Sequence, residues 1–169
     1  MKNNSFTVAV LGAGNIGSAV IERLLEVDNE VLNLSLSKVL VSDLSKERDI
    51  DGGLLTTDFD EILNDENIDL VIEVLGGVEP GKGYIKDLLE SGKSVITANK
   101  DIIADCGSEL IQIAQKNNVC LYFEAAVAAG IPVLKPIIES LRGEELTRVA
   151  GIINGTSNYI LTSMEEGST

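Results

Sequence analysis

The sequence contains no histidine and no tryptophan, and aromatic residues occupy only 4% of its 169 positions. Without histidine, the chain has no Ser-His-Asp or Cys-His catalytic group and no imidazole ligand for a metal. The shortage of aromatic side chains leaves isoleucine, leucine, valine and alanine to form the core. Together with a hydrophobic content of 44%, this aliphatic bias suits a sheet covered by helices on both faces.

Positive charge is scarce as well, since 13 lysines and arginines face 27 acidic residues, for a formal net charge of −14. A nucleic-acid binder needs a basic surface that displaces counterions, and an anionic membrane surface would repel this chain. We therefore expect no nucleic-acid or membrane partner. No stretch resembles a signal peptide or a long apolar span, so the sequence predicts a cytoplasmic protein.

Only two cysteines are present, Cys106 and Cys120. Their spacing matches neither a zinc site nor a redox motif. We interpret both as free thiols that are buried or partly buried.

Strand and helix patterns alternate along most of the chain. Short apolar runs predict strands, and apolar residues at helical spacing predict helices between them. This alternation is typical of an α/β fold with a doubly wound parallel sheet of the Rossmann type. Strands are expected at 6–11, 38–43, 70–75, 94–98 and 119–124, and helices at 16–25, 58–63, 84–90 and 108–116.

The sequence changes in character after Ala125, and Pro132 opens an expected helix that Pro136 should kink or shorten. We predict a dinucleotide-binding domain at 1–130 and the beginning of a second, α+β substrate domain at 131–169. The expected elements of the second domain also include a strand at 146–153 and a helix at 158–164.

The segment GAGNIG directly follows the first expected strand and opens the first expected helix. In that position Gly12 permits a tight turn, Gly14 lets the backbone approach a pyrophosphate, and Gly17 lets the helix pack closely on the strand. The start of the helix offers free N–H groups and partial positive charge to phosphates. A structural turn without a ligand is the alternative, but the agreement of motif, strand and helix favours a dinucleotide site.

The second expected strand ends at Asp43, where an acid would bind the adenosine ribose of NAD. Lys46 and Arg48 follow within five residues and could instead meet the 2′-phosphate of NADP. All three could also be solvated loop charges. The sequence leaves the choice between NAD and NADP open, with a slight preference for use of both.

Three further charged residues lie in expected strands or directly after them. Lys100 follows a strand end in the expected ligand crevice, where an ammonium could contact the cofactor or substrate and exchange a proton; an ordinary surface lysine is the alternative. Glu124 could hold a cation together with backbone carbonyls, or be a structural acid. Glu73 lies in the most apolar strand and needs either a partner or a place near the strand end, since an uncompensated buried carboxylate is costly.

Four longer segments combine these features: VLGGVEP (74–80), TANKDIIADCGSEL (97–110), EAAVAAGIPV (124–133) and GIINGTSNYIL (151–161). In this order and spacing they closely resemble homoserine dehydrogenases, and the resemblance extends over residues 6–164. It implies NAD(P)-dependent interconversion of L-homoserine and L-aspartate 4-semialdehyde, in the biosynthesis of threonine, methionine and isoleucine.

The resemblance also implies roles for individual residues. Lys100 would lie near the nicotinamide as a catalytic and cofactor-binding residue. A monovalent cation, usually sodium, would be held by the Glu124 side chain and by the carbonyls of Val127, Ala129 and Ile131; Ala129 stands where glycine is common in the family. The remaining cofactor contacts carry over to Gly12, Gly14, Asn15, Ile16, Gly17, Leu75 and Gly76.

The turn formed by Asn154, Gly155 and Thr156 would line the substrate side, although a helix N-cap is a competing explanation. The family's acidic substrate-binding segment and its catalytic Asp and Lys would follow beyond Thr169. The resemblance thus predicts a fragment with a nearly complete cofactor site and an incomplete catalytic site, taken from an enzyme that forms homodimers. Two alternatives stay open: a stand-alone dinucleotide-binding module without catalysis, and another Rossmann amino-acid dehydrogenase.

Overall fold

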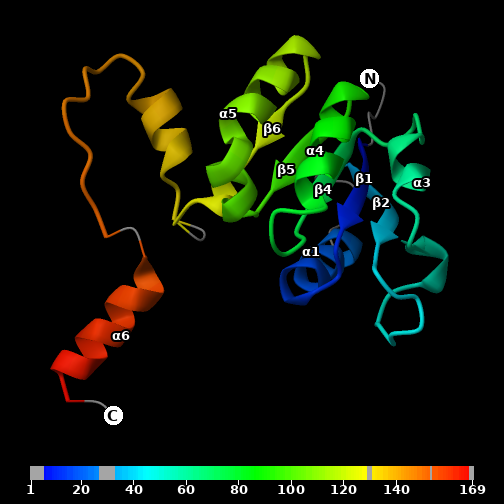
Figure 1. Cartoon of the computed structure of the whole chain (residues 1–169), viewed down its shortest axis with the longest axis horizontal. Helices are drawn as coiled ribbons and strands as arrows, with labels where there is room; N and C mark the ends of the chain where they lie inside the picture. The colour runs from blue at the N-terminus through cyan, green and yellow to red at the C-terminus, as the bar shows by residue number, and fades with distance from the viewer. Residues whose placement is uncertain (1–5, 27–32, 129–130, 153, 168–169) are drawn as a thin grey trace. The chain divides into compact units, whose positions relative to one another are not determined.

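The first part of the chain folds around a six-stranded sheet in the order β3-β2-β1-β4-β5-β6, and every neighbouring pair of strands is parallel. The predicted α/β fold with a doubly wound parallel sheet is therefore confirmed (Figure 1). The chain divides into two compact units, 1–123 and 124–169. The residues that this computed structural model describes are 6–26, 33–128, 131–152 and 154–167.

All parallel strands point their carboxyl ends to one edge of the sheet, which is where open α/β sheets bind ligands. The strands are β1 (Phe6–Leu11), β2 (Leu34–Leu40), β3 (Leu55–Thr56), β4 (Leu70–Glu73), β5 (Ser94–Thr97) and β6 (Leu121–Tyr122). The helices of this unit are α1 (Asn15–Glu26), α3 (Asp60–Leu63), α4 (Gly81–Glu90) and α5 (Lys100–Lys116), with a short 3-10 turn η1 (Gly52–Leu54).

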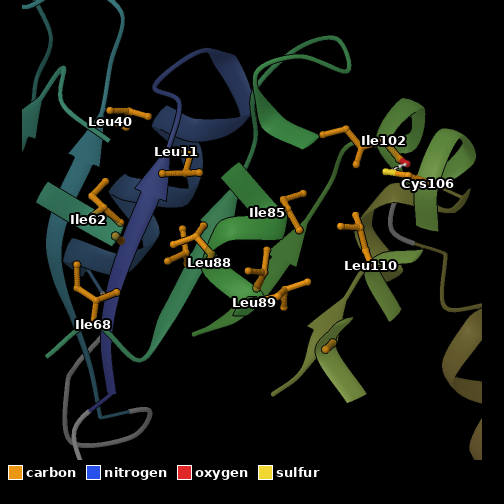
Figure 2. Packing of buried hydrophobic residues seen from close by; sticks show 14 residues of the cluster. Leu11, Leu40, Ile62, Ile68, Ile85, Leu88, Leu89, Ile102, Cys106 and Leu110 are labelled. Atoms are coloured by element: carbon orange, nitrogen blue, oxygen red, sulfur yellow. Dashed lines mark hydrogen bonds between the residues drawn. The ribbon is translucent and has the colours of Figure 1, made fainter. Parts of the chain in front are cut away.

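Aliphatic side chains form a core on each face of the sheet. Alternate residues of a strand point to opposite faces, so Leu11 joins one cluster and Val10 the other. The larger cluster packs α4 and α5 on the sheet, and Figure 2 shows Leu88 of α4 and Leu110 of α5 within it. The smaller cluster packs α1 on the other face through Ile21. The expectation of an aliphatic core between helices on both faces is met.

Some element boundaries differ from those expected. β2 ends at Leu40, so Asp43 lies in the following loop and not at the strand end. α5 begins at Lys100, because the Asn99 side chain caps it by accepting hydrogen bonds from the N–H groups of Asp101 and Ile102. The helix then continues past a break at Cys106. The two thiols are free, as expected, but only Cys106 is buried; Cys120 is exposed, which corrects that part of the prediction.

The residues Asp58 and Glu61 have the spacing of a capping box, but no such box forms at α3. The Asp58 carboxylate accepts a hydrogen bond from the Asp60 N–H at 2.9 Å, but the N-cap of α3 is Phe59, which makes no side-chain cap bond. Glu61 does not complete the box; it forms an ion pair with Lys38 at 2.9 Å. The ammonium of Lys38 carries a full positive charge, so it attracts the Glu61 carboxylate more strongly than the backbone N–H of a capping box would.

The second unit contains η2 (Glu124–Ala126), the π-helical segment η4 (Pro136–Ser140) and α6 (Gly155–Glu165). The Leu141 N–H donates to the Pro136 carbonyl at 3.0 Å, five residues back, which is the hydrogen bond of a π-helix. The predicted strand at 146–153 is wrong for its described residues, 146–152: Ile152 is 73% exposed, and no other strand is described in this unit. A strand needs a hydrogen-bonded neighbour, which apolar alternation alone does not supply.

In the residues that the structure describes, no helix combines the length and the apolar character needed to cross a bilayer.

Candidate functional site

A cleft of about 550 Å³ opens at the carboxyl edge of the sheet, where β1, β2 and β4 end. It brings together predicted residues from three separate parts of the sequence: Gly12, Gly14, Asp43, Lys46, Arg48, Leu75 and Gly76. The cleft is also lined by residues that were not predicted: Ala13, Leu40, Val41, Ser42, Thr57, Val74, Pro80 and Tyr84.

Ala13, Ser42 and Val74 directly flank predicted residues along the chain, and the strand-end rule could have found them. Tyr84 is different, because it lies on α4 and reaches the cleft from the side. Its ring stacks on Phe59 with 3.9 Å between the ring centroids. No local sequence signal connects these two aromatic residues, and only the packing of α4 brings Tyr84 to the cleft.

The glycines of the β1–α1 turn have distinct steric requirements. A Cβ on Gly17 would lie 2.1 Å from the Gly12 carbonyl oxygen, so this residue must lack a side chain. Gly12 has φ +104°, and a Cβ there would lie 3.1 Å from the Val74 carbonyl oxygen. Around Gly14 and Gly76 nothing lies within 4 Å of such a Cβ. Two glycines thus allow close packing, while the other two leave the backbone accessible.

The N-terminus of α1 faces this turn. The helix makes its first internal hydrogen bond from the Ser18 N–H to the Gly14 carbonyl at 2.8 Å, and its first turn carries no acidic residue. N–H groups in the first turn of a helix have no partner within it, and together with the helix dipole they attract anions. Asn15 and Ile16 do not line the cleft; their side chains border an apolar hollow of about 710 Å³ along the outside of α1.

The loop after β2 is closed by hydrogen bonds of its own. The Asp43 carboxylate accepts bonds from the Ser45 N–H at 2.8 Å and the Ser45 hydroxyl at 2.7 Å. These two bonds, helped by the charges of Arg48 and Lys46, lower the pKa of Asp43. Arg48 donates from Nη1 to the carbonyls of Asp43 and Lys46, at 2.8 and 2.9 Å, so it braces the loop from within. Lys46 is exposed and lines the cleft.

Glu73 has the partner that its burial requires, and it is also the last residue of β4. Its carboxylate accepts hydrogen bonds from the Leu75 N–H at 2.7 Å and from the Thr97 hydroxyl. Burial raises the pKa of Glu73, and the bonds from Thr97 and Leu75 act in the opposite direction.

Lys100 is exposed and is the first residue of α5, directly after the Asn99 cap. It lies at the carboxyl edge of the sheet but does not line the cleft. The cleft therefore brings together the predicted cofactor residues of β1, β2 and β4, and leaves Lys100 beside them on the next strand connection.

In the second unit, the Glu124 carboxylate receives three backbone hydrogen bonds. Val133 and Leu134 donate to Oε1 at 2.7 and 2.9 Å, and Lys135 donates to Oε2 at 3.0 Å. The bond from Val133 contributes most to a lowered pKa of this carboxyl. Among the described residues no group of three or more acidic, cysteine or histidine side chains could hold a metal ion. The predicted ligand Ala129 lies outside the described residues.

The substrate-side turn also lies in the second unit. Asn154 accepts a hydrogen bond from the Ser157 N–H at 2.9 Å and caps α6, which is the competing explanation considered for it. Gly155 and Thr156 form the first turn of that helix and are exposed.

All residues that line the cleft lie in a part of the chain that matches a known protein family. Residues 12–124 match a family model described as the NAD-binding domain of homoserine dehydrogenase, and residues 132–169 match a second model described as homoserine dehydrogenase. The chain belongs to the homoserine dehydrogenase family. The resemblance seen in the four sequence segments is thereby confirmed.

Individual relatives agree with this family. The homoserine dehydrogenases of Bacillus subtilis and Mycobacterium tuberculosis are 43% and 47% identical to this chain, over 93% and 94% of its length. The crystal structure of the Thiobacillus denitrificans homoserine dehydrogenase superposes with a TM-score of 0.86 at 37% identity, covering 95% of this chain and 39% of that one. A hyperthermophilic archaeal homoserine dehydrogenase in complex with NADPH gives a TM-score of 0.80 at 26% identity, covering 97% and 57%. The chain spans 38% and 37% of the first two relatives.

Proposed function

We propose that this chain supplies the NAD(P)-binding part of a homoserine dehydrogenase, which interconverts L-homoserine and L-aspartate 4-semialdehyde. The observation that carries the proposal is the cleft at the carboxyl edge, because the glycine turn, the loop after β2 and the loop after β4 meet there. The family match over residues 12–124 and the NADPH complex of the archaeal relative support it. Cytoplasmic location and homodimer formation of the intact enzyme belong to the same proposal.

The described residues fit a dinucleotide. Gly14 and Gly76 leave space where a pyrophosphate would approach the backbone, and the first turn of α1 adds no negative charge. Because the side chains of Asn15 and Ile16 border a different hollow, their contacts with the cofactor would come from the backbone.

The adenosine half would lie over β2 and the nicotinamide half over β4 and β5, on the two sides of the point where the strand order reverses. Asp43, Lys46 and Arg48 then face the adenosine ribose. Asp43 already accepts two hydrogen bonds on Oδ1, so its other oxygen is the one offered to a ribose hydroxyl. Lys46 adds an exposed cation that suits the 2′-phosphate of NADP. The cleft therefore favours binding of both cofactors, with NADP gaining the additional ion pair.

The bound cofactor supplies the hydride chemistry, and the residues of the chain bind and orient it. Leu75 and Gly76 would border the nicotinamide half, with Lys100 at the adjoining start of α5 as the charged group nearest to the reacting end. Asn154, Gly155 and Thr156 are proposed for the substrate side.

The proposal includes a monovalent cation at Glu124, with the carbonyls of Val127, Ala129 and Ile131. The ionised carboxylate suits a cation, but its two oxygens already accept three N–H groups. Sodium chloride at constant ionic strength, exchanged against tetramethylammonium chloride, should raise the melting temperature of the wild-type chain and not that of Glu124→Gln. An equal response of both proteins would remove the cation from the proposal.

The cofactor-binding function can be tested by titrating the chain with NADH and with NADPH and following nicotinamide fluorescence. We expect both to bind, and NADPH more tightly. Lys46→Gln should weaken NADPH about tenfold, because a charge-assisted contact with the 2′-phosphate is lost, and should leave NADH nearly unchanged.

Lys116→Gln is the matched control, since it removes the same charge at the far end of α5. Failure of both nucleotides to bind the folded chain would overturn the proposed function. Homoserine-dependent reduction of NAD and NADP, measured in the same samples, distinguishes a homoserine dehydrogenase from a binding module without catalysis and from a dehydrogenase of another amino acid. Binding without turnover would support a stand-alone binding module, and turnover of another amino acid would identify a different substrate.

A further inference from the structure

A continuous hydrogen-bond network connects two segments at the carboxyl edge of the sheet. It begins at Glu73 and Thr97, which are the terminal residues of β4 and β5 and are paired in the parallel register. Neither side chain has measurable solvent exposure. The Thr97 hydroxyl donates to the Glu73 carboxylate and accepts from the Asn99 N–H at 3.0 Å. The network therefore passes from one strand to the turn that follows the next.

Asn99 extends the network in two directions. Its Oδ1 accepts from the N–H groups of Asp101 and Ile102, at 3.1 and 3.2 Å, which caps α5. Its Nδ2 donates to the carbonyls of Leu75 and Gly77, at 3.2 and 2.6 Å. A helix cap requires only the acceptor oxygen. The two bonds from Nδ2 contribute nothing to α5, and their effect is to hold the loop after β4.

The Glu73 carboxylate fixes the same loop from the other side, since it accepts the Leu75 N–H. Both peptide groups that flank the Leu75 residue are therefore held by buried side chains. Leu75 and Gly76 line the cleft, and Lys100 follows Asn99 directly. One set of buried bonds thus fixes the loop that borders the cleft relative to the turn that carries Lys100.

We propose that Glu73, Thr97 and Asn99 are positioning residues for the nicotinamide half of the dinucleotide. The inference rests on the proposed function, because it is β4 and β5 that would carry this half. Buried and mutually satisfied polar groups adopt a single arrangement, since an unpaired one is costly. The loop is therefore set before the cofactor arrives, and binding does not need to order it.

Asn99→Ser tests this arrangement. Serine caps a helix about as well as asparagine but has no nitrogen to reach the Leu75 and Gly77 carbonyls. We expect the variant to bind the whole dinucleotide about tenfold more weakly, from the loss of two loop contacts, and to bind the adenosine fragment as the wild type does. The probes are NADH with AMP, and NADPH with adenosine 2′,5′-bisphosphate. Asn117→Ser makes the same exchange at the other end of α5, where the amide only bonds the Ile113 carbonyl, and is the control that should retain wild-type affinity for all four.

The ratio of dinucleotide to fragment affinity separates positioning from general destabilisation. If Asn99→Ser weakens fragment and dinucleotide equally, or weakens neither, the inference is overturned. The same holds if the wild type binds the dinucleotide no better than the fragment. If the wild type binds neither probe, the proposed function itself fails and the inference fails with it. A loss confined to the dinucleotide, with Asn117→Ser unaffected, supports the positioning role.

Discussion

Gly17→Ala is expected to abolish dinucleotide binding and to lower the free energy of unfolding by roughly 3 kcal/mol, the upper end of the usual cost of overpacking. The added Cβ would lie 2.1 Å from the Gly12 carbonyl oxygen, which is closer than such atoms approach in folded proteins. That oxygen belongs to the backbone, so no side-chain rotation relieves the clash. Either α1 or the β1–α1 turn must move. Chemical denaturation and nucleotide titration of the same variant measure the two effects.

Gly14→Ala is the matched control for this prediction. Nothing lies within 4 Å of a Cβ at Gly14, so stability should change by no more than about 1 kcal/mol, the cost of an ordinary glycine exchange. The methyl group would nevertheless stand where a pyrophosphate approaches the turn, and binding should weaken strongly. A Gly17→Ala variant as stable as the wild type would contradict the packing argument. A Gly14→Ala variant with full affinity would contradict the placement of the phosphates.

Thr97→Val is expected to lower the free energy of unfolding by about 2–4 kcal/mol, because it leaves two buried polar groups without partners. The replacement has nearly the same shape but removes the hydroxyl that donates to Glu73 and accepts from the Asn99 N–H. Thr97→Ser, which keeps the hydroxyl, should lose far less. Chemical denaturation of the three proteins under identical conditions measures the difference.

The loss caused by Thr97→Val should grow as the pH rises. Burial raises the pKa of Glu73 in the folded protein, and the Thr97 bond counteracts this effect. A carboxyl whose folded-state pKa is raised favours folding below its unfolded pKa and loses that contribution as the pH rises through the folded value. Removing the Thr97 bond raises the folded pKa further. The deficit of the variant should therefore increase from about pH 4, near the unfolded value, towards neutrality. A constant deficit between pH 4 and 8 would show that Glu73 does not titrate in this interval.

The sequence predicts the cleft well because each of its segments follows a strand that is readable from its apolar residues. Parallel strands end at one edge, so the Gly12 turn, the Asp43 loop and the Leu75 loop had to meet there. The partner of Glu73 could be expected but not named, since Thr97 is 24 residues away and pairs with it only through the β4–β5 register. Propensity also missed the start of α5, because TANK reads as a turn until the Asn99 side chain is seen to cap a helix.

The second unit shows where this reasoning stops. Apolar alternation at 146–153 predicted a strand, but a strand exists only with a neighbour, and the described residues there are irregular and exposed. For Glu124 the sequence left a cation ligand and a structural acid open, and the cation stays a prediction; the structure adds that its oxygens accept N–H groups of 133–135. A sequence gives the charge of this carboxylate, but it does not show which backbone N–H groups will donate hydrogen bonds to it.

The two hydrogen bonds from Arg48 to the carbonyls of its own loop limit how the preference of this chain between NAD and NADP can be engineered. One nitrogen of Arg48 holds the carbonyls of Asp43 and Lys46, so a substitution aimed at the 2′-phosphate would also loosen the loop that presents the ribose contacts. Lys46 lies on the same loop and can be exchanged without breaking either bond. A redesign toward NAD should therefore begin at Lys46 and alter Arg48 only after another residue has taken over the support of the loop. Natural mutations that change the preference between NADP and NAD, and leave the protein folded, would likewise have to alter Lys46 before Arg48.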